Sequence, residues 1–221
     1  MPAPKERPVR KDVARNRQRL LDAGKEVFAA QGLDATLDDI ARHAGVGAGT
    51  AYRHFGSRQE IINAIFADVA QSFIADAEQA LTIDDAWTGL VAFIEAFAER
   101  QATDRGLHQV FTGDHGAALR TADWHRLISA ITALVERAKR SGQVRADVQT
   151  SDVVGLFAVL GPAYDLSAAT SVAAWRRYVD FFLRAIQISA PAAVIPVPPA
   201  ISLPKILAIV GGPAARFSGR G

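Results

Sequence analysis

Apolar side chains recur at helical spacing through most of this chain. In the first such segment, residues 11–31, one face of a helix would carry Leu20, Gly24, Val27 and Phe28. These four positions fall at i, i+4, i+7 and i+8, which is the spacing of an amphipathic helix. The same periodicity predicts further helices at 36–44, 48–54, 57–80, 84–102, 105–113, 121–141, 150–167 and 172–188. We find no convincing strand pattern and no internal repeat, so the pattern predicts an all-α protein of about nine helices.

Glycine and capping residues mark the boundaries of the first four predicted helices. Gly32 follows the first helix at a position that suits a C-cap. Thr36 opens the second, with Asp39 three residues later in a capping-box arrangement. Gly45 ends that helix, and Ser57 caps the long fourth one. These local signals predict two short helices followed by a long one.

The prolines mark the ends of the helical body. Three of the ten prolines lie in residues 1–8 and six lie in residues 190–221, while only Pro162 lies between these segments. Proline stops helices, so the body is expected to lie between two irregular ends. The chain then divides into a basic flexible arm at 1–10, a first helical domain at 11–56, a second helical domain at 57–189 and a Pro-rich, disordered tail at 190–221. A tail that touches a membrane is the less favoured alternative.

The composition excludes several classes of protein. The chain has 221 residues, of which 49% are apolar and 22% charged, as in an ordinary globular protein. It has no cysteine, which excludes disulfide scaffolds, thiolate zinc sites and cysteine nucleophiles. No run of 18 or more apolar residues is present, and the basic N-terminus lacks the apolar segment of a signal peptide. We therefore expect a cytoplasmic protein without a metal or cofactor.

Charge is unevenly distributed, although the net charge is only +2. Residues 1–20 carry seven basic and two acidic side chains, whereas residues 61–189 carry eleven basic and fifteen acidic ones. A basic end on a mildly acidic body indicates that this end meets a polyanion. From charge alone, a solvated basic tail is an equally good interpretation.

Residues 37–56 carry the motif with the clearest chemical meaning. They read LDDIARHAGVGAGTAYRHFG, in which a short helix, a glycine turn and a second short helix form a helix-turn-helix. The second helix presents polar groups on its outer side, namely Thr50, Tyr52, Arg53 and His54. A helix of this kind fits the major groove of B-DNA, which is roughly 12 Å wide.

The run from Thr36 to Ile61, TLDDIARHAGVGAGTAYRHFGSRQEI, resembles the N-terminal signature of the TetR/AcrR family of bacterial transcriptional regulators. The resemblance covers about residues 16–66, and its Y-x-H-F-x-S-[KR] run lies at the right distance from the T-x-x-x-I-A segment. It implies an all-α dimer in which three helices bind DNA and the C-terminal helices form a ligand pocket and the dimer interface. It also implies a repressor that a small molecule releases from a two-fold symmetric operator.

The resemblance also assigns roles to individual residues. Tyr52, His54 and Arg58 would contact phosphates. The less favoured alternative for Tyr52 is a ring packed within the small domain, and the two roles are compatible. Thr50 would contact a phosphate or a base edge. The complete set of expected DNA contacts comprises Thr36, Ala48, Gly49, Thr50, Tyr52, Arg53, His54, Arg58, Arg10 and Arg17.

The sequence departs from many relatives at Gly47, Ala48 and Gly49, where side chains able to reach bases are absent or reduced to a methyl group. Base reading would then depend on Thr50, Arg53, backbone contacts and a contact between Ala48 and a thymine methyl group. We therefore expect the basic arm to contribute more to DNA binding, by following the DNA backbone or entering a minor groove.

If the body is a sensor, aromatic and polar side chains should surround a cavity. The candidates are Trp87, Phe93, Phe97, His108, Phe111, Trp124, Phe157 and Tyr164. Taken singly, each aromatic residue is better explained as ordinary core. Because pockets are also mostly apolar, the sequence does not separate the two interpretations. The segment from His108 to His115 fits no metal-binding motif.

Residues 150–188 carry two apolar stripes that we assign to the dimer interface. The expected interface residues are Val154, Phe157, Gly161, Trp175, Tyr178 and Phe182. Two helices from each subunit would form a four-helix bundle. The alternative is that both stripes face the core of their own chain.

Two other functions compete with a ligand-released repressor. An all-α enzyme is disfavoured because the chain has no GxxxxGK[ST], HExxH or GxSxG run. A DNA-binding protein that responds to no ligand remains open, although a body more than twice the size of the DNA-binding part exceeds what binding alone requires.

Overall fold

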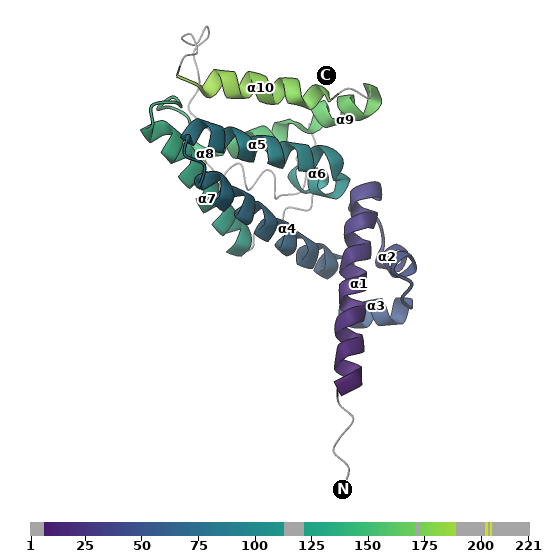
Figure 1. Cartoon of the computed structure of the whole chain (residues 1–221). Helices are drawn as coiled ribbons and strands as arrows, with labels where there is room; N and C mark the ends of the chain where they lie inside the picture. The colour runs from purple at the N-terminus through teal and green to yellow at the C-terminus, as the bar shows by residue number, and fades with distance from the viewer. Residues whose placement is uncertain (1–6, 113–121, 171–172, 189–201, 203, 205–221) are drawn as a thin grey trace.

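A computed structural model of the chain describes residues 7–112, 122–170 and 173–188, together with Ser202 and Pro204. These residues form helices and no strand beyond an isolated bridge between Val144 and Gln187. The helices are α1 (Arg7–Gln31), α2 (Leu37–Ala44), α3 (Ala48–His54), α4 (Arg58–Leu81), α5 (Ala86–Thr103), α6 (Arg105–Thr112), α7 (Ala122–Arg140), α8 (Thr150–Val159), α9 (Gly161–Thr170) and α10 (Ala174–Ile186) (Figure 1). The prediction of an all-α fold is confirmed.

Two boundaries differ from the expected ones. The first helix begins at Arg7, so residues 7–10 continue α1, although we expected them in a flexible arm. The helix expected at 150–167 is two segments, α8 and α9, which meet at Leu160. Pro162 explains this break, because proline has no N–H to donate to the preceding turn and restricts the residue before it. The expected Pro-rich tail lies outside the described residues, apart from the exposed Ser202 and Pro204.

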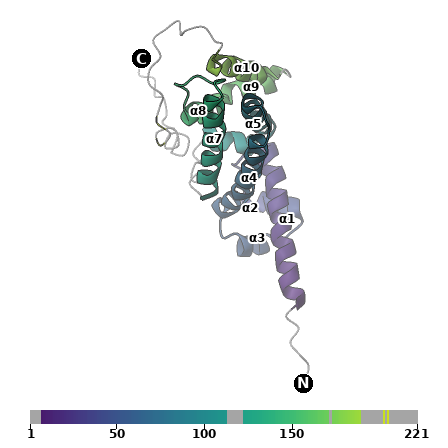
Figure 2. The same ribbon diagram turned by 60° about the vertical axis from the view of Figure 1, so that its left-hand side comes forward.

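Helices α1 to α3 form a small unit at one end of the molecule, and α5 to α10 form a larger body. Helix α1 projects from this small unit away from the body, with the N-terminus at its far end (Figures 1 and 2). Helix α4 begins beside α1 and runs into the body, where it packs along α5 and α7. The two parts are also joined by an ion pair of 3.1 Å between Lys25 of α1 and Asp68 of α4.

The core is continuous through both parts. In the small unit, Leu20, Ile40 and Ile61 are fully buried at the junction of α1, α2 and α4. In the body, the rings of Phe73 and Phe97 stack with centroids 4.1 Å apart, and those of Phe97 and Phe157 stack at 3.9 Å. The stack ties α4, α5 and α8 together, and burial of such large aromatic surfaces dominates core energetics.

Among the described residues, one segment is long and apolar enough to cross a membrane. It runs from Thr150 to Thr170 and comprises α8 and α9, and 39% of its most apolar window is buried within the protein. Core helices of globular proteins pass the same test, so this segment gives no reason to assign a membrane span.

Candidate DNA-binding surface

The start of α2 is fixed by a capping box. The Thr36 hydroxyl oxygen accepts a hydrogen bond of 3.1 Å from the Asp39 backbone N–H, and the Asp39 carboxylate accepts one of 3.0 Å from the Thr36 N–H. The Thr36 hydroxyl also donates to that carboxylate at 2.5 Å. These bonds from Thr36, together with one from Arg42, lower the pKa of Asp39 from 3.8 to about 2. Thr36 is exposed, but its hydroxyl group is already engaged in the hydrogen bonds that cap α2.

A glycine in the left-handed backbone conformation turns the chain from α2 toward α3. Gly45 has φ 61° and ψ 37°, a conformation that costs little only for glycine. The N–H of Val46 then donates to the Ala41 carbonyl at 2.9 Å, which closes the end of α2. The sequence expectation of a tight glycine turn is thus met by the geometry of a helix-turn-helix.

Helix α3 has a buried face and an open one. Ala51 and Phe55 are buried against the small unit, while the ring of Tyr52 is 49% exposed and Arg53 is exposed. Thr50 and His54 are half-buried. Tyr52 is therefore not a fully packed residue, which favours the phosphate-contact interpretation.

The start of α3 carries almost no side-chain bulk. Gly47, Ala48 and Gly49 are exposed, and a Cβ placed at Gly47 or Gly49 would meet nothing within 4 Å. This surface lets the α3 backbone approach a DNA groove closely, but it offers few groups that distinguish bases.

Arg53 is held in place by its own helix. Its Nε donates to the Gly49 carbonyl at 3.0 Å and its Nη2 donates to the Thr50 hydroxyl at 3.0 Å. The guanidinium has further N–H groups, so these bonds orient the side chain along α3 without exhausting its donors. Arg53 and Thr50 thus form one polar unit on the outer side of α3.

Three further arginines frame α3. The Arg17 guanidinium lies over the Phe55 ring at 5.1 Å, which brings α1 beside the C-terminal end of α3. Arg58 donates to the Asp34 carbonyl at 3.3 Å, and Arg19 donates to the Ala44 carbonyl at 2.6 Å. The sequence analysis missed Arg19, because its contact spans 25 residues of sequence and no local pattern indicates it. Arg17 thus lies beside the C-terminal end of α3, and Arg58 opens α4 four residues after α3 ends.

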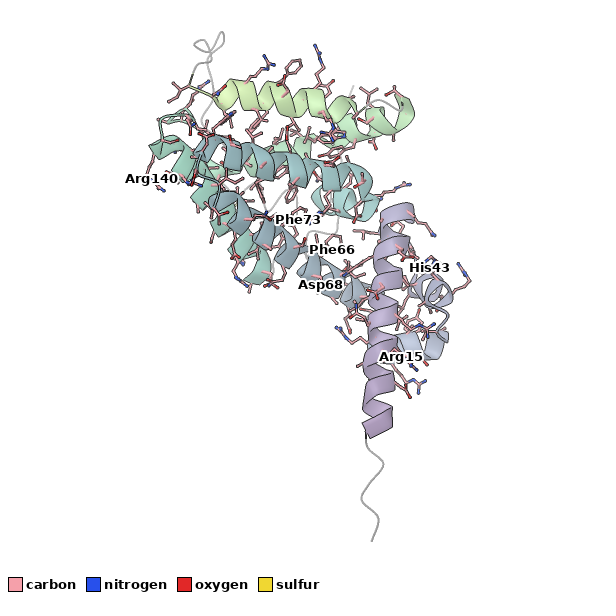
Figure 3. The ribbon with its side chains drawn as sticks, in the orientation of Figure 1. Arg15, His43, Phe66, Asp68, Phe73 and Arg140 are labelled. Carbon is pink, nitrogen blue, oxygen red and sulfur yellow. The ribbon has the colours of Figure 1, made fainter. Side chains whose placement is uncertain are left out.

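Arg10 belongs to α1, and its side chain lies outside the described residues. Figure 3 shows Arg15 on the part of α1 beside α2 and α3, with His43 on the neighbouring α2. The ring of His43 is 2.7 Å from the Glu26 carboxylate, which joins α2 to α1. The exposed basic residues of α1 thus lie on the same unit as α3.

Most of the expected sensor residues lie inside the body. Phe93, Phe97, Trp124, Phe157 and Tyr164 are buried, whereas Trp87 and His108 are half-buried. The backbone of Phe111 lies in α6, but its side chain is outside the described residues, as is His115. Phe93 also lines an open groove of about 170 Å³ between α4 and α5.

Gln101 joins two of these residues and was not identified from the sequence. It is 1% exposed, its Nε2 donates to the Phe157 carbonyl at 3.2 Å, and its Oε1 accepts from the Tyr164 hydroxyl at 3.1 Å. The ring of His108 meets the Tyr164 ring edge-on, with centroids 5.6 Å apart. Burial raises the pKa of Tyr164 and lowers that of His108, so both side chains favour their neutral forms. A glutamine on the apolar face of the helix predicted at 84–102 was the available signal.

The expected interface residues fall into two groups. Val154, Phe157, Gly161 and Trp175 are buried within the chain, so in this conformation they cannot form an extended contact with a second subunit. Tyr178 is 46% exposed and Phe182 is half-buried.

Apolar side chains that the sequence analysis missed are exposed on the same helices. They are Val159 of α8, Leu166 of α9 and Phe181 of α10, which are 70%, 46% and 49% exposed. The ring of Phe181 meets that of Tyr178 edge-on, with centroids 6.4 Å apart. We call these four exposed side chains, Val159, Leu166, Tyr178 and Phe181, the α8–α10 apolar patch. The Arg177 guanidinium lies over the Phe181 ring at 4.8 Å.

Comparison with known proteins agrees with the fold and with the motif. Residues 20–65 match the family of bacterial regulatory proteins of the TetR type, and residues 85–184 match the C-terminal domain of SbtR-like transcriptional regulators. The helix-turn-helix transcriptional regulator SrpR of Pseudomonas putida is 33% identical over 151 residues, which are 64% of this chain and 69% of SrpR.

Solved structures show the same relationship. A TetR transcription regulatory protein from Mycobacterium vanbaalenii has a TM-score of 0.56 at 30% identity, over 82% of this chain and 100% of that one. FadR from Bacillus subtilis, solved in complex with stearoyl-CoA, has a TM-score of 0.57 at 17% identity, over 75% of this chain and 97% of that one, and it shares the fold. The chain belongs to the TetR family of transcriptional regulators.

Proposed function

We propose that this chain is a dimeric repressor that binds a two-fold symmetric operator in the cytoplasm and is released from it by a small molecule. The observation that carries the proposal is the arrangement of α3. Ala51 and the following Phe55 are buried and anchor the helix, while Tyr52 and Arg53 are exposed. Arg17 and Arg58 lie beside it and can contact phosphates on either side. Contacts of this kind fix the register of a helix in the major groove.

The α8–α10 apolar patch is where we place the dimer interface. It exposes Val159, Leu166, Tyr178 and Phe181, all large apolar or aromatic side chains of the kind that occupy the centre of interfaces. The patch lies on helices at the end of the body opposite α1 to α3 (Figure 1). A second copy bound there would leave both α3 helices free to reach successive major grooves, roughly 34–36 Å apart.

We place the effector in the body, near the Gln101 and Tyr164 side chains. Gln101 and Ser151 are polar residues buried in the described core, and neither is charged. Such surroundings favour an uncharged and largely apolar effector with one hydrogen-bonding group. The TetR-family fold accommodates a ligand in FadR, where stearoyl-CoA is bound. A coupling of about 1–3 kcal/mol between effector and operator would weaken DNA binding roughly 5–150-fold.

The experiment that tests this function is a mobility shift across a salt series, on the intergenic DNA beside the gene of this protein. The test variant combines Tyr52→Phe with Arg58→Ala. The control is Arg140→Ala, which removes an exposed arginine from the end of α7 that is remote from α1 to α3 (Figure 3). We expect tight, salt-dependent binding by the wild type and the control, and loss of that binding in the test variant.

Equal and weak binding to this DNA and to unrelated DNA would contradict the proposal for this operator. If the wild type binds specifically, addition of candidate uncharged effectors tests the second part. Operator affinity that no effector changes would favour a regulator without a ligand.

A further inference from the structure

Gln109 of α6 reaches from the body to the end of α1. Its Oε1 accepts a hydrogen bond of 2.5 Å from the backbone N–H of Leu33, which follows the last turn of α1. Leu33 is fully buried, and Gln109 is half-buried. The bond joins residues that are 76 positions apart in the sequence. It therefore connects the body to the segment that leads into α2.

The chain around this bond is shaped to fit it. Gly32 has φ 85°, and a Cβ there would lie 2.5 Å from Oε1 of Gln109, so the glutamine side chain occupies the space that a larger residue would fill. Gly106, one turn earlier in α6, lies against Phe28, with its would-be Cβ 3.1 Å from the Phe28 Cβ. Two glycines thus allow α6 and the end of α1 to approach closely.

The neighbouring residues of α6 face the body. Leu107 is fully buried, and the ring of His108 meets the ring of Tyr164 at 5.6 Å. The start of α6 is fixed by Asp104, whose carboxylate accepts the Leu107 N–H at 2.9 Å. Helix α6 therefore contacts the body through Leu107 and His108, and the DNA-binding unit through Gly106 and Gln109.

We propose that Gln109 is a positioning residue that sets the orientation of the DNA-binding unit relative to the body, by holding the end of α1 through the Leu33 N–H. The inference rests on the proposed function and names a side chain through which the body holds that unit. Without the glutamine, the Leu33 N–H loses this acceptor at a buried site, and the end of α1 gains freedom to tilt on α6. A freer orientation lowers operator affinity, because both α3 helices must meet their half-sites at a fixed spacing.

The test compares three variants. Gln109→Met keeps the length of the side chain and removes the acceptor, while Gln109→Glu keeps an oxygen that can accept the Leu33 N–H. The matched control is Gln79→Met, at an exposed position on α4. Each is measured for affinity to a duplex that the wild type selects from a random library. Each is also measured for the distance between spin labels at Ala30→Cys and Glu95→Cys.

These labels suit the purpose because the chain has no cysteine of its own, and both labelled positions are accessible, on α1 and α5. The labelled chain is mixed with an excess of unlabelled chain, so that the distances within one subunit dominate the signal. The distance distribution reports the orientation of α1 on the body directly. A residue that only contributes stability would leave this distribution unchanged.

We expect Gln109→Met to broaden the distance distribution and to lower operator affinity at least about fivefold, as loss of a buried hydrogen bond would. Gln109→Glu should retain most of both properties, and Gln79→Met should match the wild type. An unchanged distribution and affinity in Gln109→Met would overturn the inference, even if its melting temperature fell. If the wild type selects no duplex, the proposed function fails, and the label distances in the free protein still confirm or refute the role of Gln109.

Discussion

Gly89 lies in the first turns of α5, where this helix passes the end of α4. A Cβ at this position would be 2.5 Å from the backbone oxygen of Ala80 and 3.5 Å from its carbonyl carbon. Both atoms belong to the main chain of α4, so no side-chain rotation can relieve the contact. We predict that Gly89→Ala destabilises the protein, although alanine is the better helix former.

The size of the effect follows from two opposing terms. Helix propensity alone would favour alanine over glycine by about 1 kcal/mol. An ordinary contact between carbon and a carbonyl oxygen is about 3.3 Å or longer, so α4 and α5 would have to separate by about 0.8 Å. The end of α4 resists this shift, because Arg137 of α7 donates to the carbonyls of Leu81 at 2.7 Å and Asp84 at 2.9 Å.

Overpacking of this kind costs about 1–3 kcal/mol, and the rigid surroundings place Gly89→Ala toward the upper end of that range. The net loss of unfolding free energy should be about 1–2 kcal/mol. For a chain of this size, the midpoint of thermal unfolding would fall by about 2–8 °C.

The assay is urea and thermal unfolding followed by circular dichroism, at one protein concentration because the proposed dimer makes stability concentration-dependent. The matched control is Gly49→Ala in α3, where a Cβ meets nothing within 4 Å. That variant should be as stable as the wild type or gain up to about 1 kcal/mol. The reasoning is refuted if Gly89→Ala is stabilised to the same extent as Gly49→Ala.

Four further predictions concern the start of α2 and the two proposed interfaces. Thr36→Ala removes the N-cap of α2 and should lower the unfolding free energy by about 1 kcal/mol, measured in urea. The pKa of Asp39 is lowered from 3.8 to about 2, so the stabilisation given by its carboxylate is present above pH 3.8 and is lost as the pH falls toward 2. An acid titration of the wild type should therefore show a decline in unfolding free energy over this range, and Thr36→Ala should make the decline smaller. Tyr178→Asp and Phe181→Asp place a charge in the α8–α10 apolar patch, and sedimentation should show folded monomers; a retained dimer would place the interface elsewhere. Deletion of residues 1–10 should weaken operator binding and reduce the salt dependence by about 0.9 for each phosphate that the arm no longer neutralises, and an unchanged affinity and slope would remove the arm from the interface.

The DNA-binding motif could be predicted well from the sequence because its signals are local. The capping box of Thr36 and Asp39 and the turn at Gly45 each depend on residues within a few positions of one another. The bounds of α3, Ala48–His54, agree with the predicted 48–54 for the same reason. At residues 7–10, the nearby prolines suggested that the first helix starts later than it does in the structure.

The body could not be predicted to the same depth, since its contacts join distant residues. Helix α10 carries large apolar side chains on more than one side. Periodicity alone therefore does not predict that Trp175 is only 5% exposed while Phe181 is 49% exposed. Gln101 and Gln109 likewise depend on partners 56 to 76 positions away. Only the packing of the helices brings these partners together.

The lack of side chains at the start of α3 and the hydrogen bond that joins Gln109 to the end of α1 both bear on how the protein would recognise its operator. Because Gly47, Ala48 and Gly49 carry almost no side chain, the proposed DNA-binding mode leaves direct reading of bases by α3 chiefly to Arg53 and Thr50. In the proposed dimer, discrimination between operators would then depend more on phosphate contacts, on the shape of the DNA and on the spacing of the two half-sites. A regulator of this kind is sensitive to small changes in the orientation of its DNA-binding unit, since a shifted unit loses register at many phosphates at once. The link from α6 to the end of α1 is therefore placed where a modest structural change would have a large effect on operator affinity.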